Sequence, residues 1–387
     1  MIYLKRKFLL LGLCLLVQSC TLVDDYLLGK DNTIKPTPLT EIKPKLKLVD
    51  NWSVITNKPS KSSSYLKLKP VVKGNIIYIA NASGEVDAVN KDSGKIIWSK
   101  QLPNSIVSGP AVAHGYIALG TNRSTVILLR ESDGEQLHKF KISGEALSKP
   151  AIISDKIIIK TIDGYLYGFD LKTGQKLWSA EHGSPSLILK ASSSPIIVNK
   201  LAIVGFSDGK LDAIDTENGR IIWQRSIAYA NGSSDVERLV DIDADPIIRG
   251  DIAYLASYQG YIGALSLTDG QFIWRKAGSV YKNMAVDNST LYITDSNDVL
   301  WALNRNDGKV KWKQVALKGR VLTEPTILGN RLVVGDRSGF LHVLSTSSGE
   351  FIARKELNGT IDISPAISGN SIYVMTANGN LSKLTAS

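Results

Sequence analysis

The chain has 387 residues, a formal net charge of +10, 32 glycines, seven tryptophans and only two cysteines. Its lysines are scattered rather than gathered into a basic stripe with aromatic residues, which argues against a nucleic-acid-binding protein. It also has no phosphate-binding loop and no Gly-x-Ser-x-Gly turn, and its four histidines are far apart in sequence, so the usual nucleotide, hydrolase and zinc motifs are missing.

The first 19 residues have the pattern of a bacterial secretion leader. Lys5-Arg6-Lys7 forms a basic start, and residues 8–17 form an apolar core that is too short to span a bilayer. The segment that follows, Val17-Gln18-Ser19-Cys20, resembles the lipobox of bacterial lipoproteins, so we expect cleavage before Cys20 and acylation of Cys20. The alternative is an ordinary signal peptide with an incidental cysteine. Thr21 follows instead of aspartate, which resembles lipoproteins sorted to the outer membrane.

Residues 20–45 are predicted to form a flexible, extended tether between the lipid and a folded domain. Pro36, Pro38 and Pro44 favour extended backbone, and several lysines accompany them. The second cysteine, Cys14, lies in the leader, so the folded body has neither a thiol nor a disulfide. Its stability must therefore come from strand pairing and packing.

From residue 46 onward one spacing recurs seven times. A proline that starts a strand is followed by a turn glycine 14 residues later, a second glycine 10 later and a tryptophan 4 later, first as Pro70, Gly84, Gly94 and Trp98. A period near 40 residues indicates stacked structural repeats. The last position of the spacing is occupied in turn by Trp98, His138, Trp178, Trp223, Trp274, Trp312 and Ala353.

Each repeat contains several short strand patterns. In the first repeat, residues 76–80, 85–89 and 96–98 are rich in β-branched and aromatic residues, and turn residues separate them. Four antiparallel strands per repeat form a β-propeller blade. We expect the glycines to adopt positive φ at the turns, with Ser124 and Asp298 substituting at two of them, and the tryptophans to pack between neighbouring blades.

The eighth repeat lacks its outer strand. After Gly379 the second glycine would fall beyond Ser387. Leu48–Ile55 carries Trp52 in phase with the other tryptophans, so we predict that it supplies this strand and closes the ring. The sequence thus predicts an all-β, eight-bladed propeller over residues 46–387, with about 43 residues per blade.

Two neighbouring connections between blades are enlarged. The distance from the tryptophan position to the next proline is 12 or 13 residues at four connections, but 17 from Trp178 to Pro195 and 23 from Trp223 to Pro246. Because each blade has an even number of strands, all these connections emerge on one face. Two long loops side by side on a rigid scaffold indicate a binding site.

The repeats resemble those of quinoprotein dehydrogenases, as in Ala213-Ile214-Asp215 followed by Gly219 and Trp223. In that class the repeat packs blades together, and this chain lacks the adjacent cysteine pair and any insertion large enough for the quinone site. The whole chain more closely resembles the BamB family of propeller lipoproteins. The most specific segments are residues 185–190 and 237–243.

The BamB resemblance implies a non-enzymatic scaffold on the periplasmic face of the outer membrane. It would belong to the β-barrel assembly (BAM) complex, bind the POTRA domains of BamA, assist insertion of outer-membrane β-barrel proteins and hold no cofactor or metal. Unfolded client chains could also bind exposed strand edges. The competing expectation is a quinoprotein-like periplasmic enzyme or a propeller that binds a small ligand.

The resemblance and the long connections select the same surface. Apolar anchors, cations and carboxylates are all available there: Leu187, Leu189, Lys190, Arg238, Asp241 and Asp243. An apolar centre with charged surroundings is typical of protein interfaces. Two alternatives stay open, because the leucines could instead tuck over the blades and the two aspartates could brace the loop.

Overall fold

A computed structural model of the chain describes residues 34–56, 66–190, 192–231 and 233–387. Within these ranges, Thr37–Ser387 forms one compact unit whose regular elements are all β-strands, as predicted. The described residues contain no helix long and apolar enough to cross a membrane. The predicted leader and Cys20 lie outside the described residues.

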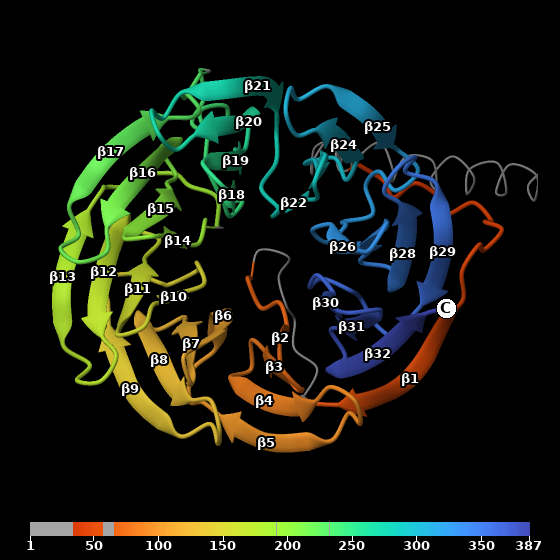
Figure 1. Ribbon diagram of the computed structural model, residues 1–387, viewed down its shortest axis with the longest axis horizontal. Coiled ribbons are helices and arrows are strands. Elements are labelled where there is room, and N and C mark those ends of the chain that lie inside the picture. The colour runs from red at the N-terminus through yellow and green to blue at the C-terminus, as the bar shows by residue number, and fades with distance from the viewer. Residues whose placement is uncertain (1–33, 57–65, 191, 232) are drawn as a thin grey trace, which may run out of the picture. The chain divides into compact units, whose positions relative to one another are not determined.

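The unit contains eight sheets of four antiparallel strands, arranged as propeller blades around a common centre (Figure 1). In seven blades the strands run in chain order from the centre to the rim. Blades 1 to 4 are formed by β2 (Val71–Lys73), β3 (Ile76–Ala80), β4 (Glu85–Asn90) and β5 (Ile96–Gln101); β6 (Ile106–Ala113), β7 (Tyr116–Thr121), β8 (Thr125–Arg130) and β9 (Gln136–Lys141); β10 (Ala151–Ile152), β11 (Lys156–Lys160), β12 (Tyr165–Asp170) and β13 (Lys176–Glu181); and β14 (Ile196–Val198), β15 (Leu201–Gly205), β16 (Lys210–Asp215) and β17 (Ile221–Ser226).

Blades 5 to 7 repeat this order, and blade 8 contains three consecutive strands. These blades are formed by β18 (Ile247–Arg249), β19 (Ile252–Ala256), β20 (Gly260–Ser266) and β21 (Phe272–Gly278); β22 (Ala285–Val286), β23 (Thr290–Thr294), β24 (Leu300–Asn304) and β25 (Val310–Gln314); β26 (Thr326–Leu328), β27 (Arg331–Gly335), β28 (Phe340–Ser345) and β29 (Phe351–Glu356); and β30 (Ala366–Ser368), β31 (Ser371–Met375) and β32 (Asn380–Ala386).

The fourth strand of blade 8 is β1 (Leu48–Ile55), with the bounds predicted from the sequence. It pairs antiparallel with β32, from Leu48 opposite Ala386 to Ile55 opposite Asn380. Lys47 and Ser387 exchange two further backbone hydrogen bonds of 3.0 Å. The first and last strands of the ring therefore close it, as Figure 1 shows.

The compact unit begins nine residues before residue 46. Thr37 N donates to Lys318 O at 3.0 Å, and Arg320 Nη1 donates to Thr37 O at 3.1 Å. Arg354 Nη1 donates to Thr40 O at 2.7 Å. Residues 37–45 of the expected tether therefore contact blades 6 and 7.

The tryptophan positions lie at the seams between neighbouring blades, as predicted. Trp98 of blade 1 donates its indole N–H to Glu131 O of blade 2 at 3.3 Å, and its ring would lie 2.8 Å from a Cβ on Gly134. His138 Nε2 lies 3.0 Å from Lys172 O at the next seam, so this ring is packed like the tryptophans. The indole contact recurs at five seams, through Trp52, Trp98, Trp178, Trp274 and Trp312.

Apolar side chains fill the space between each blade and the next. In one cluster, Tyr78 and Val86 of blade 1 pack with Ile117 and Leu119 of blade 2, and all four side chains are almost fully buried. The alternating strand pattern thus buries one face of each sheet against each neighbour, and the core is a ring of such layers.

The first turn of each blade follows the glycine prediction with one exception. Ser124 (φ 50°) and Asp298 (φ 62°) take the left-handed conformation, as expected for substitutes of glycine. In blade 5, however, the positive φ belongs to Gln259 (49°) and not to Gly260. Gly260 is required for space instead, because a Cβ there would lie 2.3 Å from Ser257 Oγ.

Candidate functional site

The two enlarged connections lie side by side, as predicted. We call residues 182–195 the first long link and residues 227–246 the second long link. Leu189 N in the first donates to Asp241 Oδ1 in the second at 3.1 Å, and Ser194 N donates to Asp245 Oδ1 at 2.6 Å. The two links therefore form one joined surface.

Three of the six predicted contact residues are exposed. Leu187 is 43% exposed, and Lys190 and Arg238 are also exposed. Lys190 Nζ lies 4.0 Å from Glu145 Oε2, a weak surface ion pair that leaves the ammonium accessible. Leu189 is only half-buried, so part of its side chain remains accessible.

The two predicted carboxylates lie inside the molecule. Asp241 and Asp243 are almost fully buried, although the links that carry them run over the surface. Burial raises the pKa of Asp241 to about 6, against the hydrogen bond from Leu189 N, which lowers it. Asp241 thus fastens the first long link to the second.

Asp243 lies in a buried cluster of charges at the inner end of the second long link. Burial raises the pKa of Asp243 and lowers that of Lys160, which donates to Gly205 O at 2.6 Å. Neither carboxylate oxygen of Asp243 has a hydrogen-bond partner among the described residues. Lys67 Nζ donates to the backbone O of Asp243 at 2.9 Å and forms a short ion pair with Asp245.

His182 holds the start of the first long link. Its Nδ1 lies 2.6 Å from Asp212 Oδ2 and its Nε2 lies 3.0 Å from Asp208 Oδ1, while the ring stacks on Phe206 with centroids 3.7 Å apart. Burial lowers the pKa of His182, but the two hydrogen-bonded carboxylates outweigh it and raise the pKa to about 9. The imidazole is therefore protonated at neutral pH and links blade 3 to blade 4.

The second long link also exposes apolar side chains that the sequence analysis did not select. Tyr229 is 65% exposed and Val236 is 61% exposed. Both lie in the longest connection of the ring, and exposed apolar side chains on an enlarged loop are typical of interfaces. The length of the link was the available signal, but it did not identify which of its side chains point outward.

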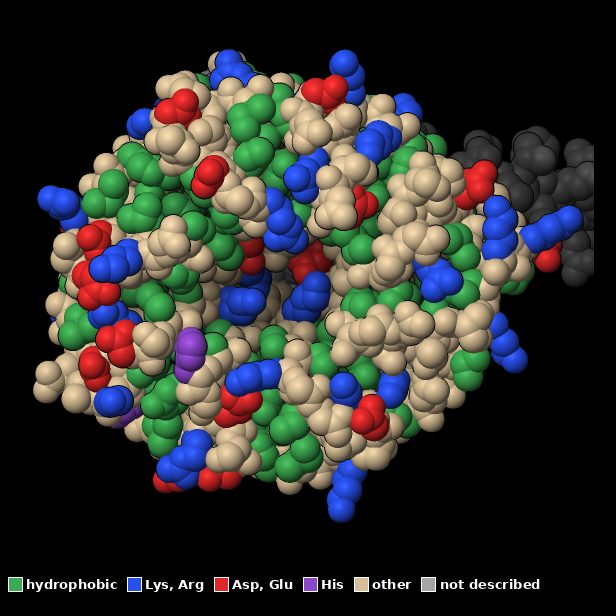
Figure 2. Space-filling model, viewed as in Figure 1, with side chains coloured by type: hydrophobic (Ala, Val, Ile, Leu, Met, Phe, Trp, Pro, Cys, Tyr) green, Lys and Arg blue, Asp and Glu red, His purple; other side chains and the backbone are tan. Residues whose placement is uncertain are grey.

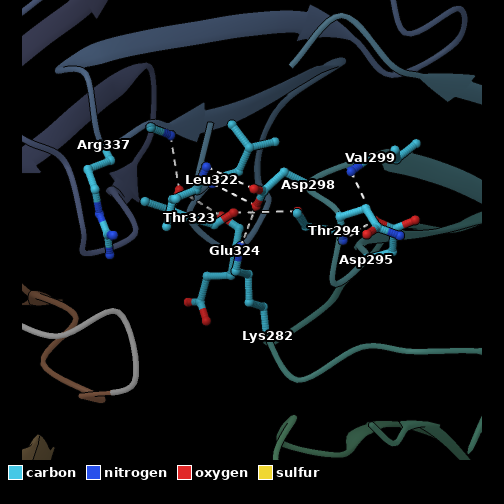
Figure 3. Close-up of polar contacts among 12 residues, drawn as sticks. Lys282, Thr294, Asp295, Asp298, Val299, Leu322, Thr323, Glu324 and Arg337 are labelled. Atoms are coloured by element: carbon cyan, nitrogen blue, oxygen red, sulfur yellow. Dashed lines mark hydrogen bonds and ion pairs between the residues drawn. The ribbon is translucent and has the colours of Figure 1, made fainter. Parts of the chain in front are cut away.

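A connection of ordinary length is tied down more closely, as Figure 3 shows between blades 6 and 7. Asp298 accepts hydrogen bonds from Lys282 Nζ at 2.7 Å, Val321 N at 2.8 Å and Leu322 N at 2.9 Å. Burial lowers the pKa of Lys282, and the nearby Asp298 carboxylate partly offsets this by raising it. This turn aspartate fixes a short link against the blade.

The centre of the ring is polar. On the face seen in Figure 2, charged side chains of both signs gather around a hollow at the centre. The inner links line a cavity of about 140 Å³, where Lys67 pairs with Asp245 and Lys69 Nζ lies 3.0 Å from Glu324 Oε1. No three His, Cys, Asp or Glu side chains of the described residues are arranged to hold a metal ion.

Comparison with known families accounts for the whole propeller. The family model described as "Outer membrane protein assembly factor BamB" matches residues 50–119, 82–314 and 315–387. The chain belongs to this family.

Relatives in this family are similar over nearly their full length. A protein named outer membrane protein assembly factor BamB from Legionella pneumophila (strain Paris) is 57% identical over 384 residues, which cover 99% of this chain and 100% of the relative. The protein of the same name from Escherichia coli (strain K12) is 30% identical over 393 residues, covering 98% and 99%. The BamB resemblance expected from the two sequence segments is confirmed.

Solved structures share the fold. BamB from Moraxella catarrhalis superposes with a TM-score of 0.79 at 24% identity, covering 88% of this chain and 100% of that one. A europium-containing methanol dehydrogenase superposes with a TM-score of 0.71 at 13% identity, covering 87% and 93%. These likenesses show the propeller alone and carry no conclusion about catalysis.

Proposed function

We propose that this chain is a non-enzymatic scaffold of the β-barrel assembly machinery that docks onto the POTRA domains of BamA through its two long links. The observation that carries the proposal is the hydrogen bond from Leu189 N to Asp241, which joins two neighbouring enlarged links into one surface. Membership of the BamB family, whose relatives are named outer membrane protein assembly factors, supports the same role.

The six residues divide into two roles in this proposal. Leu187 is an exposed apolar anchor, and Lys190 and Arg238 offer cations at its side. Asp241 and Asp243 are both buried, so neither offers its carboxylate to the partner. Asp241 braces the first long link by accepting the hydrogen bond from Leu189 N, whereas Asp243 interacts with the charges of Lys67 and Lys160. Leu189 does both, because its backbone N–H bonds to Asp241 and its side chain is half-exposed.

The proposal includes the site of action. Acylation of Cys20 would anchor the protein to the periplasmic face of the outer membrane, where BamA inserts β-barrel precursors. By occupying the POTRA domains, the propeller would support the folding and insertion of these precursors. Direct binding of unfolded clients to strand edges is a secondary part of the proposal.

The alternative of a small-molecule enzyme has less support. Pockets that enclose a drug-sized ligand have volumes of about 300–1,000 Å³. The cavity at the centre of the ring measures about 140 Å³, and ion pairs already engage Lys67 and Lys69 in its lining.

A binding measurement tests the proposal. Full-length BamA in detergent is captured on a sensor, and the mature protein is compared with a Leu187→Ala/Leu189→Ala variant. We expect the dissociation constant to rise about tenfold or more, as for loss of central apolar anchors. The control is Ile97→Ala, because Ile97 is 50% exposed on β5 of blade 1, far along the ring from both links.

The result can contradict the proposal in two ways. If the wild-type protein does not bind BamA, the proposed partner is wrong. If the double variant binds as tightly as the Ile97→Ala control while its unfolding curve is unchanged, the proposed surface is wrong.

A further inference from the structure

Residues 233–238 of the second long link form one preformed turn. Ser234 Oγ accepts a hydrogen bond from Glu237 N at 3.3 Å, and Glu237 Oε2 accepts one from Ser234 N at 3.1 Å. Such reciprocal bonds between a serine and a glutamate three residues later form a capping box. Ser233 reinforces it, donating both its N–H (2.8 Å) and its Oγ–H (3.0 Å) to the same carboxylate oxygen.

The carboxylate of Glu237 is the centre of this turn. It receives three hydrogen bonds from two residues, and Arg238 N closes the turn on Ser234 O at 3.1 Å. The bonds from Ser233 and Ser234 lower the pKa of Glu237, so the acceptor is charged at neutral pH. All of these residues lie at the surface, so the turn is held by its own hydrogen bonds rather than by burial.

The turn is fixed at its end to the body of the propeller. Leu239 and Val240, directly after it, are buried, and Gln259 Nε2 of blade 5 donates to Val236 O at 3.3 Å. The side chain of Val236 is nevertheless 61% exposed, and Arg238 is exposed two residues later. An apolar and a cationic side chain are thus presented on a rigid support.

We propose that Glu237 is a positioning residue that preforms a second docking element, in which Val236 enters an apolar depression of the partner and Arg238 meets a carboxylate beside it. The inference rests on the proposed function, because the partner is the one that the long links bind. The preformed turn increases affinity because its backbone need not be ordered during binding.

Charge favours this occupant over a membrane surface or a nucleic acid. Asp235, Glu237 and Arg238 give the turn a net negative charge, which anionic lipid and phosphate would repel. A polypeptide surface with an apolar depression and separate charges fits both the valine and the mixed charges around it.

Substitutions at Glu237 test the positioning role on the full mature chain with full-length BamA as the probe. Glu237→Ala removes the acceptor, and we expect the dissociation constant to rise about 3- to 30-fold, as for loss of a cap. Glu237→Gln keeps an acceptor of the same shape and should stay within about threefold of wild type. Ser234→Ala removes only the 3.3 Å hydrogen bond from Glu237 N and leaves the three bonds to the Glu237 carboxylate, so its effect should be smaller than that of Glu237→Ala. Ser234→Thr should bind like wild type.

A double-mutant cycle separates positioning from direct contact. Val236→Ala/Arg238→Ala removes the presented side chains, and adding Glu237→Ala to that variant should weaken binding by less than about twofold. Urea unfolding of Glu237→Ala should match wild type, since the carboxylate is exposed and touches no buried group.

The outcomes distinguish this inference from the proposed function. Suppose that BamA binds wild type and binds the Leu187→Ala/Leu189→Ala variant more weakly, but binds Glu237→Ala and Val236→Ala/Arg238→Ala with the wild-type dissociation constant. Then only the second docking element is overturned. Additive effects in the cycle would overturn the positioning role. If wild type does not bind BamA, the proposed function is overturned, and this inference with it.

Discussion

A single histidine illustrates how individual side chains shape this surface. His182 follows β13, the outer strand of blade 3, and meets Asp208 and Asp212 of blade 4 where the first long link begins. Its ring is enclosed by Phe206 and the two carboxylates, so the positive charge has little access to water. A charged bridge at this point sets the direction in which the link leaves the blade.

Replacing His182 should destabilise the fold in a pH-dependent way. The folded pKa of about 9 lies above the ordinary value of 6.5, so the bridge contributes fully below about pH 6.5 and is lost as pH rises through 9. We expect His182→Gln to lower the free energy of unfolding at pH 6 by about 1.5–3 kcal/mol, the range for charge-assisted hydrogen bonds. Urea titrations at pH 6, 8 and 9.5 measure this. A difference between variant and wild type that stays constant up to pH 9.5 would contradict the bridge.

A pair of glycines in blade 2 separates backbone conformation from packing at a seam. Gly115 and Gly134 both have positive φ (84° and 72°), but a Cβ on Gly115 meets open space and one on Gly134 would lie 2.8 Å from the Trp98 ring. Gly115→Ala should lower the free energy of unfolding by about 1–2 kcal/mol, because alanine is strained in the left-handed backbone conformation. Gly134→Ala should cost about 1–3 kcal/mol more, because the seam must open. If thermal unfolding shows the same loss of stability for both variants, the packing of Trp98 does not require a glycine at position 134.

At the scale of the elements, periodic spacing was enough to predict most of the strands. Residues 76–80 have the observed bounds of β3, and Leu48–Ile55 has those of β1. In blade 1, β4 is one residue longer than predicted and β5 is three residues longer. The reason is that the apolar side-chain pattern ends before the backbone pairing does. The packing of residues 37–45 was not predicted, since it depends on Arg320 in the link between blades 6 and 7 and on Arg354 of blade 7, both about 300 residues away along the chain.

Two shortened chains should show that β1 closes the ring while the preceding segment only supports it. A chain that starts at residue 46 keeps β1 and loses the contacts of Thr37 and Thr40, so we expect it to fold with a lower melting temperature. A chain that starts at residue 57 loses β1 and the Trp52 contact with Lys91 O, and leaves β32 with an unpaired edge.

The free energy of unfolding of the second shortened chain should be lower by more than about 3 kcal/mol, as for removal of a packed tryptophan. This chain should also associate through the unpaired edge of β32. Thermal unfolding and size-exclusion chromatography distinguish the two chains. If both chains remain monomeric with the same melting temperature, pairing of β1 with β32 is not what closes the ring.

At the scale of the whole molecule, the eight seams are not equivalent. Between blades 4 and 5 the indole N–H of Trp223 has no hydrogen-bond partner among the described residues, and Arg225 lies over Gly270 in place of a ring, donating to Asp269 O at 3.0 Å. Trp223 instead lines a pocket of about 180 Å³ with Leu267 and others. The second long link connects the two blades of this looser seam.

The seam between blades 4 and 5 should therefore open before the seam between blades 3 and 4, where the Trp178 indole donates to Thr216 O at 3.0 Å. We expect amides of β17 to exchange with deuterium about tenfold faster than those of β13, the ratio given by a 1.4 kcal/mol difference in opening free energy. Both are the outer strands of their blades. Mass spectrometry of the exchanged peptides measures this, and uniform rates around the ring would contradict it.

The candidate surface was predictable in position but not in its chemistry. The 17- and 23-residue spacings placed both long links correctly, because an even number of strands fixes the face on which links emerge. They could not reveal that Asp241 and Asp243 point inward or that Val236 points outward. Those orientations depend on the path of the irregular backbone in the two links. Side chains in such backbone follow no periodic pattern that the sequence could reveal.

The pairing of β1 with β32 also fixes when the ring can be completed during synthesis. The partner of β1 is β32 (Asn380–Ala386), so β1 has no strand to pair with until residues 380–386 have been made. Loss of Asn380–Ala386 would therefore be more damaging than loss of β1, because it would leave only β30 and β31 paired and β1 without a partner.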